Sequence, residues 1–152
     1  MTPGMLRGQV IAERSAWIRK MIDQVKDLPL ESYDLFCSDP RNLGAAESYL
    51  RRCLEALLDL GRHLLAKGFG RPVSEYKAIA MVLEEQGVLD EKERLTMVKL
   101  TGYRNRMVHF YQEISEQELY EICTGRLGDI EELLSTFLKW VTGHPEKIDR
   151  SL

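Results

Sequence analysis

The feature that most constrains this fold is a long leucine stripe at helical spacing. From Leu43 to Leu64, leucines and one glycine recur at steps of three, four and seven residues, which places them on one face of an α-helix. Asp39 and Pro40 precede the stripe, and they suit an N-cap and a first helical position. We therefore predict a helix from Pro40 to about Lys67.

A glycine interrupts the middle of this predicted helix. Gly61 lies on the apolar stripe, where a glycine costs roughly 1 kcal/mol relative to alanine. A close crossing with another helix would explain it, because a side chain there would keep the two backbones apart.

Four further stretches show the same kind of spacing. We expect helices over residues 8–26, from Ser74 to Gly87, from Asp90 to about Tyr103, and over residues 115–142. Those that begin at positions 90 and 115 open with a capping residue followed three positions later by glutamate, which is a capping box. β-branched residues are scarce and no strand-like alternation persists, so we predict no sheet.

Together these helices predict an all-α, up-and-down helical bundle of about five helices. The 152 residues suit a single domain over 1–152, with its core at about 8–142 and a loose tail over 143–152. Five amphipathic helices in a small chain often bury one face by dimerising, so we also predict a homodimer.

Composition and charge exclude several classes. No apolar run reaches the roughly 20 residues of a membrane helix, and the N-terminal residues lack the pattern of a signal peptide, so we expect a cytoplasmic protein without a membrane partner. The three cysteines and three histidines form no metal-binding motif, so we expect neither metal nor cofactor. The net charge of −3 argues against a large duplex-binding surface, although it permits a compact site for one or two phosphates.

The chemistry-bearing segment is Thr101–Gln112. It contains Arg104, then four residues, then His109. A guanidinium holds phosphate through a planar fork of donors, and an imidazole exchanges protons near neutral pH. RNA supplies its own nucleophile, the 2′-OH. Arg104 and His109 are therefore the minimum set for cutting RNA without a metal, which would leave a 2′,3′-cyclic phosphate.

The spacing of this pair constrains its geometry. On a regular helix, residues five apart are rotated by about 140° and displaced by about 7.5 Å. Either the helix breaks between Arg104 and His109, or the site combines residues from two chains about a two-fold axis. We favour a composite dimer site with a bend near His109. Taken singly, each residue could instead be structural, as a complement to the helix dipole or as a cap.

The string Arg104-Asn-Arg-Met-Val-His109-Phe-Tyr111 matches the RX4HXY motif of the HepT-like toxins, within the HEPN superfamily. Residues 32–39 and 47–66 also resemble the segment that leads into the second helix of this family and that helix itself. The resemblance implies an all-α, HEPN-like bundle that dimerises with its motifs facing each other across a cleft. It implies a metal-independent endoribonuclease that acts as the toxin of a toxin–antitoxin pair.

The resemblance also implies roles for single residues. His109 would be the general base or acid, Arg104 would bind and polarise the phosphate, and Asn105 would assist. The family is typically encoded with a minimal nucleotidyltransferase antitoxin, and some such antitoxins add AMP to the motif tyrosine. Tyr111 would be that AMP acceptor here, and the added charge would repel RNA.

Two other functions stay open. The chain could be a catalytically silent HEPN partner that binds a nucleotide or regulates an associated nucleotidyltransferase, or it could be a purely structural helical dimer. For His63, His144 and Tyr103 we expect structural or solvated positions rather than roles in the chemistry.

Overall fold

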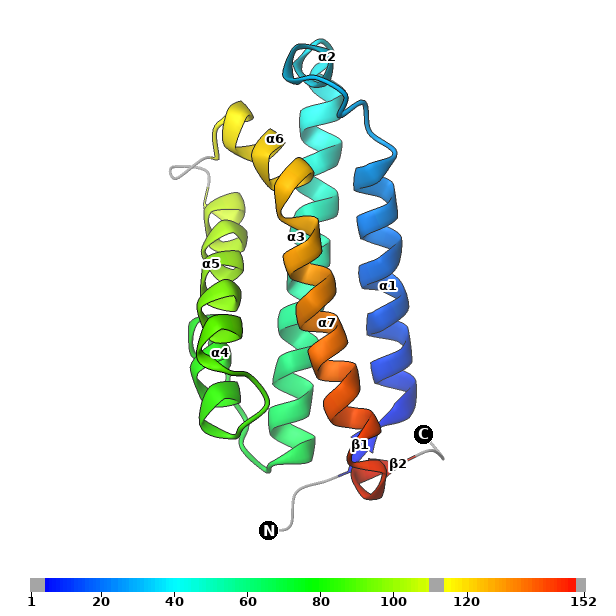
Figure 1. Cartoon of the computed structure of the whole chain (residues 1–152), viewed down its shortest axis with the longest axis vertical. Coiled ribbons are helices and arrows are strands. Elements are labelled where there is room, and N and C mark those ends of the chain that lie inside the picture. Colours follow the sequence, from blue (N-terminus) through cyan, green and yellow to red (C-terminus); the bar gives the residue numbers. More distant parts are fainter. Residues whose placement is uncertain (1–4, 110–113, 150–152) are drawn as a thin grey trace.

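The computed structural model describes residues 5–109 and 114–149. These residues form an all-α bundle, as predicted, although it has seven α-helices instead of about five. Figure 1 shows α1, α3 and α7 running along the long axis, α4 and α5 on one side, and α2 and α6 at one end. The elements are β1 (Leu6–Arg7), α1 (Gly8–Lys26), α2 (Tyr33–Cys37), α3 (Pro40–His63), η1 (Leu64–Gly68), α4 (Tyr76–Glu85), α5 (Glu91–Val108), α6 (Glu116–Gly125), α7 (Leu127–Thr142), η3 (Pro145–Lys147) and β2 (Ile148–Asp149).

The long leucine-rich helix is α3. It begins at Pro40, and the Asp39 carboxylate accepts a hydrogen bond from the backbone N–H of Arg41 at 2.9 Å, so the predicted cap is confirmed. The helix continues as η1, one turn of π-helix that ends at Gly68. The predicted end near residue 67 is therefore right, but the last turn is wider than an α-helical turn.

Gly61 marks the close crossing that its sequence position predicted. A Cβ atom at Gly61 would lie 3.2 Å from Ile79 Cγ2 and 3.2 Å from Leu83 Cδ1, both on α4. These distances are shorter than ordinary carbon–carbon contacts. The glycine therefore lets α4 lie close against α3.

The prediction of about five helices was wrong in two places. The segment predicted as one helix over 115–142 divides at Arg126 into α6 and α7. Because the apolar spacing continues through the break, the sequence pattern does not reveal the change of direction. The second omission is α2, a five-residue helix capped by the Ser32 hydroxyl, which is too short to display an amphipathic period.

The prediction that the chain has no sheet was also wrong. β1 and β2 pair in parallel, with Leu6 opposite Ile148. Strands of two residues are too short to show alternation, so the sequence gives no signal for them. Where the sequence predicts a loose tail over 143–152, the structure places η3 and β2, and the Lys147 ammonium donates to the Gly68 carbonyl at 2.7 Å.

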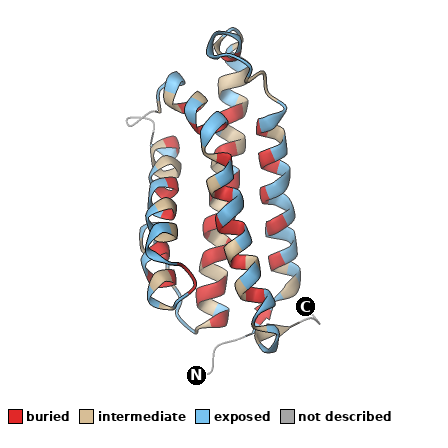
Figure 2. Cartoon of the chain, in the orientation of Figure 1, coloured by how far each residue is buried: buried red, intermediate tan, exposed pale blue. Residues whose placement is uncertain are grey.

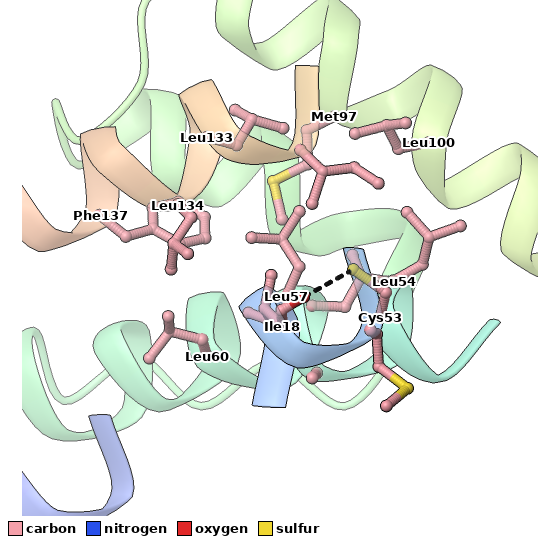
Figure 3. Packing of buried hydrophobic residues seen from close by; sticks show 14 of the residues in the cluster. Ile18, Cys53, Leu54, Leu57, Leu60, Met97, Leu100, Leu133, Leu134 and Phe137 are labelled. Carbon is pink, nitrogen blue, oxygen red and sulfur yellow. Dashed lines mark hydrogen bonds between the residues drawn. The ribbon is translucent and has the colours of Figure 1, made fainter. Parts of the chain in front are cut away.

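The core lies between α1, α3, α5 and α7. Figure 2 shows the buried positions as stripes along these helices, and Figure 3 shows Ile18, Leu57 and Phe137 close together within this cluster. The Cys53 thiol lies here and donates to the Ile18 carbonyl at 3.7 Å. Burial raises the pKa of Cys53 to about 12, so this thiol stays neutral and unreactive near pH 7.

Candidate functional site

The boundaries of α5 position the motif. The predicted capping box is confirmed at its start: the Asp90 carboxylate accepts from Glu93 N at 2.7 Å, and the Glu93 carboxylate accepts from Asp90 N at 3.0 Å. The helix ends at Val108, and His109 has an extended backbone with φ −103° and ψ 95°. The predicted bend near His109 is therefore confirmed, and the helix stops between the arginine and the histidine.

This bend brings three motif residues to one pocket of about 530 Å³. Arg104, Asn105 and His109 come from the C-terminal end of α5. His109 is exposed, and the Arg104 side chain is 23% exposed, so a ligand can reach both. The other lining residues come from α3 and from the segment that begins α4: Arg62, Ser74, Glu75, Tyr76 and Lys77.

Contacts from three helices hold Arg104 in place. Its Nε donates to Glu55 Oε1 on α3 at 3.4 Å, and its Nη1 donates to Asn105 Oδ1 at 3.2 Å. The guanidinium carbon lies 4.7 Å from the ring centroid of Tyr76 on α4, which is a cation–π contact. Glu55 is shared, because Arg51 also donates to its Oε1, at 3.3 Å. Arg104 is thus oriented but still accessible.

The residues that α3 and α4 bring to this site could not be predicted from the sequence. The Tyr76 hydroxyl donates to Asp59 Oδ1 at 2.9 Å, and Arg62 Nη2 donates to the same oxygen at 2.6 Å. Burial, and after it the hydrogen bond to Asp59, raises the pKa of Tyr76, so its hydroxyl remains a donor near neutral pH. In the sequence, Asp59 and Arg62 look like an ordinary exposed ion pair on a helix, and nothing there connects them with Arg104.

The other two histidines lie outside this pocket. His63 Nε2 accepts a hydrogen bond from the backbone N–H of Arg7 at 3.1 Å. Burial, and then nearby cations, lower the pKa of His63. His144 stacks on Trp140, and its Nδ1 lies 2.7 Å from the carbonyl oxygen of that residue. Both histidines therefore make structural contacts. This is as expected for His63, whereas His144 was expected to be solvated and instead packs against Trp140.

The remaining site predictions need separate mention. Tyr111, the predicted AMP acceptor, lies outside the described residues. Over residues 5–109 and 114–149, no three histidine, cysteine, aspartate or glutamate side chains gather in a way that could hold a metal ion. In the same part of the chain, no helix combines the length and the apolar character needed to cross a membrane.

The fold and the pocket together define a class: an all-α bundle with an arginine and a histidine at the end of one helix, suited to a phosphate-bearing ligand. The family described as "Ribonuclease HepT-like" matches residues 18–137, which is most of the chain. The protein therefore belongs to the HepT-like ribonuclease family, and the resemblance noted in the sequence is confirmed.

Known proteins agree with this assignment. A protein of Archaeoglobus fulgidus described as "Putative RNase" is 28% identical over 96 residues, which is 63% of this chain and 69% of that protein. A tri-AMPylated Shewanella oneidensis HEPN toxin, solved in complex with an MNT antitoxin, superposes with a TM-score of 0.78 at 20% identity, covering 86% of this chain and 97% of the toxin. The cytosolic protein YutE of Bacillus subtilis, of unknown function, gives 0.76 at 16% identity, covering 92% and 94%. The two structures establish the HEPN-like fold.

Proposed function

We propose that this protein is a metal-independent endoribonuclease that cleaves RNA by attack of the 2′-OH. The observation that carries the proposal is the meeting of Arg104, Asn105 and His109 at one accessible pocket. A phosphate-binding fork and a proton-exchanging ring are the two groups that this reaction requires. Membership of the HepT-like ribonuclease family supports the same reaction.

The proposed mechanism uses the nucleophile of the substrate. His109 takes the proton of the 2′-OH, and the resulting oxygen attacks the adjacent phosphorus. Negative charge grows on the non-bridging oxygens, and the Arg104 guanidinium stabilises it. The bond from phosphorus to the 5′-oxygen then breaks, and that oxygen takes a proton from water, while His109 returns its proton to the solvent. The products are a 2′,3′-cyclic phosphate on one fragment and a 5′-OH on the other.

Asn105 has a supporting role in this proposal. Its side-chain oxygen accepts from Arg104 Nη1 at 3.2 Å, which restrains the guanidinium in addition to its contact with Glu55. Its amide nitrogen, on the same pocket wall, is a donor suited to a phosphate oxygen.

We further propose that two copies form the working unit. α5 carries three exposed large apolar side chains: Leu95 is 53% exposed, Val98 is 43% exposed and Val108 is 37% exposed. A second copy covering these side chains would remove them from water, and a two-fold axis beside α5 would bring the two motifs towards each other. The site would then be composite, with RNA lying between the two copies.

The biological role proposed here is that of a cytoplasmic toxin controlled by a minimal nucleotidyltransferase antitoxin. The support is the fold shared with a Shewanella toxin that is AMPylated and bound to an MNT antitoxin. Tyr111 would accept AMP on its hydroxyl two residues after His109. The added phosphate would repel the RNA backbone from the pocket.

The deciding experiment is cleavage of mixed RNA in the presence of a chelator. Wild type should generate fragments that end in 2′,3′-cyclic phosphate, and His109→Ala and Arg104→Ala should not. Arg41→Ala is the control, because that side chain is exposed and pairs locally with Asp39. Folding of each variant is checked by its thermal melting curve. If wild type binds nucleotides but never cuts RNA, the nuclease proposal is wrong and the protein is a catalytically silent binding partner.

A further inference from the structure

The pocket contains a second arginine that the cleavage mechanism does not use. Arg62 lies near the end of α3, and its side chain is 38% exposed. Its Nη2 donates to Asp59 Oδ1 at 2.6 Å and its Nη1 donates to the Ser74 carbonyl at 3.3 Å. Of the five N–H donors of a guanidinium, these contacts within the described chain take two, so Arg62 keeps donors for a ligand.

The ring of Tyr76 connects this arginine with Arg104. The guanidinium carbons of Arg62 and Arg104 lie 5.0 and 4.7 Å from the centroid of that ring. Two cations near each other in water would repel. Here the negative face of the aromatic ring attracts both, and the hydroxyl of the same residue is fixed by Asp59 at 2.9 Å. Tyr76 therefore contacts two guanidiniums that both line the pocket.

The charges around the pocket favour an anion longer than one phosphate. Three cationic side chains line it, those of Arg62, Lys77 and Arg104, together with one carboxylate, that of Glu75. Asp59 and Glu55 each accept a bond from one of these two arginines and offset part of this charge. What suits a longer anion is that both guanidiniums keep N–H donors at the same pocket. A single scissile phosphate needs one guanidinium, so the second cation suits the next phosphate along a strand.

We propose that Arg62 binds a phosphate next to the scissile one in single-stranded RNA, and that Tyr76, which contacts both guanidiniums, is the positioning residue that holds Arg62 and Arg104 at the pocket. The inference rests on the proposed ribonuclease function, and it adds a second contact to the same site. It assigns α3 and α4 to substrate binding, while α5 carries the cleavage chemistry.

Binding is measured separately from cleavage with a labelled 2′-O-methyl oligonucleotide of mixed sequence, which has no 2′-OH nucleophile. Arg62→Gln should raise the dissociation constant about tenfold, the effect of one lost charged hydrogen bond. It should also reduce the slope of log affinity against log salt by about 0.7, which corresponds to one phosphate contact on a single strand. A merely structural arginine would leave this slope unchanged.

Arg126→Gln is the matched control. Like Arg62, Arg126 forms an ion pair with an aspartate three residues away, Asp129. The side chains of Arg126 and Asp129 are 41% and 29% exposed, which is close to the 38% and 29% of Arg62 and Asp59. It does not line the Arg104 pocket. Its substitution should change neither the affinity nor the salt slope.

Two substitutions test Tyr76. Tyr76→Phe keeps the aromatic face, so its RNA affinity should stay within about threefold of wild type. Tyr76→Leu removes the cation–π contacts, so its RNA affinity should fall further. In cleavage assays, Tyr76→Leu should lower kcat as well as raise KM, because Arg104 loses its support, and Arg62→Gln should act mainly on KM. Equal effects of Phe and Leu would overturn the positioning role.

The two proposals fail in different ways. If wild type cleaves RNA and Arg62→Gln binds the oligonucleotide with unchanged affinity and salt slope, the second phosphate contact is wrong and the nuclease stands. If wild type binds the oligonucleotide with a slope that depends on Arg62 but never cleaves RNA, the contact stands and the nuclease is wrong. If wild type neither binds nor cleaves RNA, both are wrong.

Discussion

Two of the hollows on the described part of the chain differ in a way that size does not predict. The larger, of about 670 Å³, lies between α1 and α7, and the smaller, of about 530 Å³, lies where α3, α4 and α5 meet. The larger is lined by apolar side chains and by charged ones such as Arg19 and Lys139, with no histidine among its described residues. The smaller contains His109 beside Arg104.

The difference shows that the kinds of side chain, and not the volume, mark a site for chemistry. In the larger hollow, Lys26 and Glu131 form an ion pair at 3.1 Å with side chains 55% and 49% exposed, so water screens them and the pair contributes little. In the smaller hollow, Arg104 is 23% exposed and contacts an aromatic ring. Less water there means stronger electrostatic interaction with a bound phosphate.

The largest expected effect is on RNA cleavage, and it tests directly which of the two hollows binds the substrate. His109→Ala should lower kcat/KM for RNA by about 10²- to 10⁴-fold, the usual contribution of a positioned general base. Lys139→Ala, in the larger hollow, should stay within about twofold of wild type, because an exposed lysine there would touch no substrate. Steady-state cleavage of one fluorogenic RNA measures both. A strong loss of kcat/KM in the Lys139 variant would instead indicate that the substrate binds in the larger hollow.

The next effect concerns the second copy proposed beside the smaller hollow. Leu95→Asp should convert a dimer into a monomer in light scattering at micromolar concentration, since a buried carboxylate would disfavour the interface. If the site is composite, kcat/KM should fall about tenfold or more together with dimerisation. Trp17→Asp is the control, because it removes a 37% exposed apolar side chain on α1, a different helix from α5. Dissociation in the tryptophan variant alone would place the interface there.

A smaller effect is expected on stability rather than on chemistry. Gly61→Leu should lower the free energy of unfolding by about 1–3 kcal/mol, the usual cost of overpacking, because Ile79 and Leu83 occupy the space. A Cβ atom at Gly44 on the same helix would meet no atom within 4 Å, so Gly44→Leu should not destabilise the fold. Urea denaturation compares the two. Equal destabilisation would mean that the crossing of α3 and α4 does not depend on the glycine.

The smallest effect concerns His63, which follows Arg62 in the sequence but does not line the pocket. The folded state lowers the pKa of His63 below its ordinary value of about 6.5. Below that value the unfolded chain binds more protons than the folded protein. The contribution of His63 to the free energy of unfolding is therefore fully present above about pH 6.5, and it is lost as the pH falls through the folded pKa. His63→Gln removes this titration. The stability difference between wild type and variant, measured by urea denaturation from pH 7.5 to 5.5, should therefore narrow or reverse towards low pH, whereas a constant difference would contradict the assignment.

The elements that the sequence predicted share one property, which is that their signals are local. The start of α3 at Pro40, the capping box at Asp90 and the bounds of α1 each depend on residues within one or two turns. The Arg104–His109 motif is local too, and so is the end of α5 between them. Such patterns can be recognised without knowledge of the rest of the chain.

The elements that it missed leave no periodic signal in the sequence: α2 is too short to show one, and the others are set by the tertiary structure. β1 and β2 form because residues 6 and 148 meet, and the break at Arg126 turns α7 along the bundle without altering the apolar spacing.

The sequence by itself determined the class of fold and the pair of residues on which the proposed chemistry rests, because helix periods, caps and a short motif are written in neighbouring positions. Only the tertiary structure decided that α3 and α4 bring Arg62 and Tyr76 to Arg104. The physical reason is that a guanidinium is oriented by whichever carboxylate or ring packs against it, and here those groups lie tens of residues away in the chain.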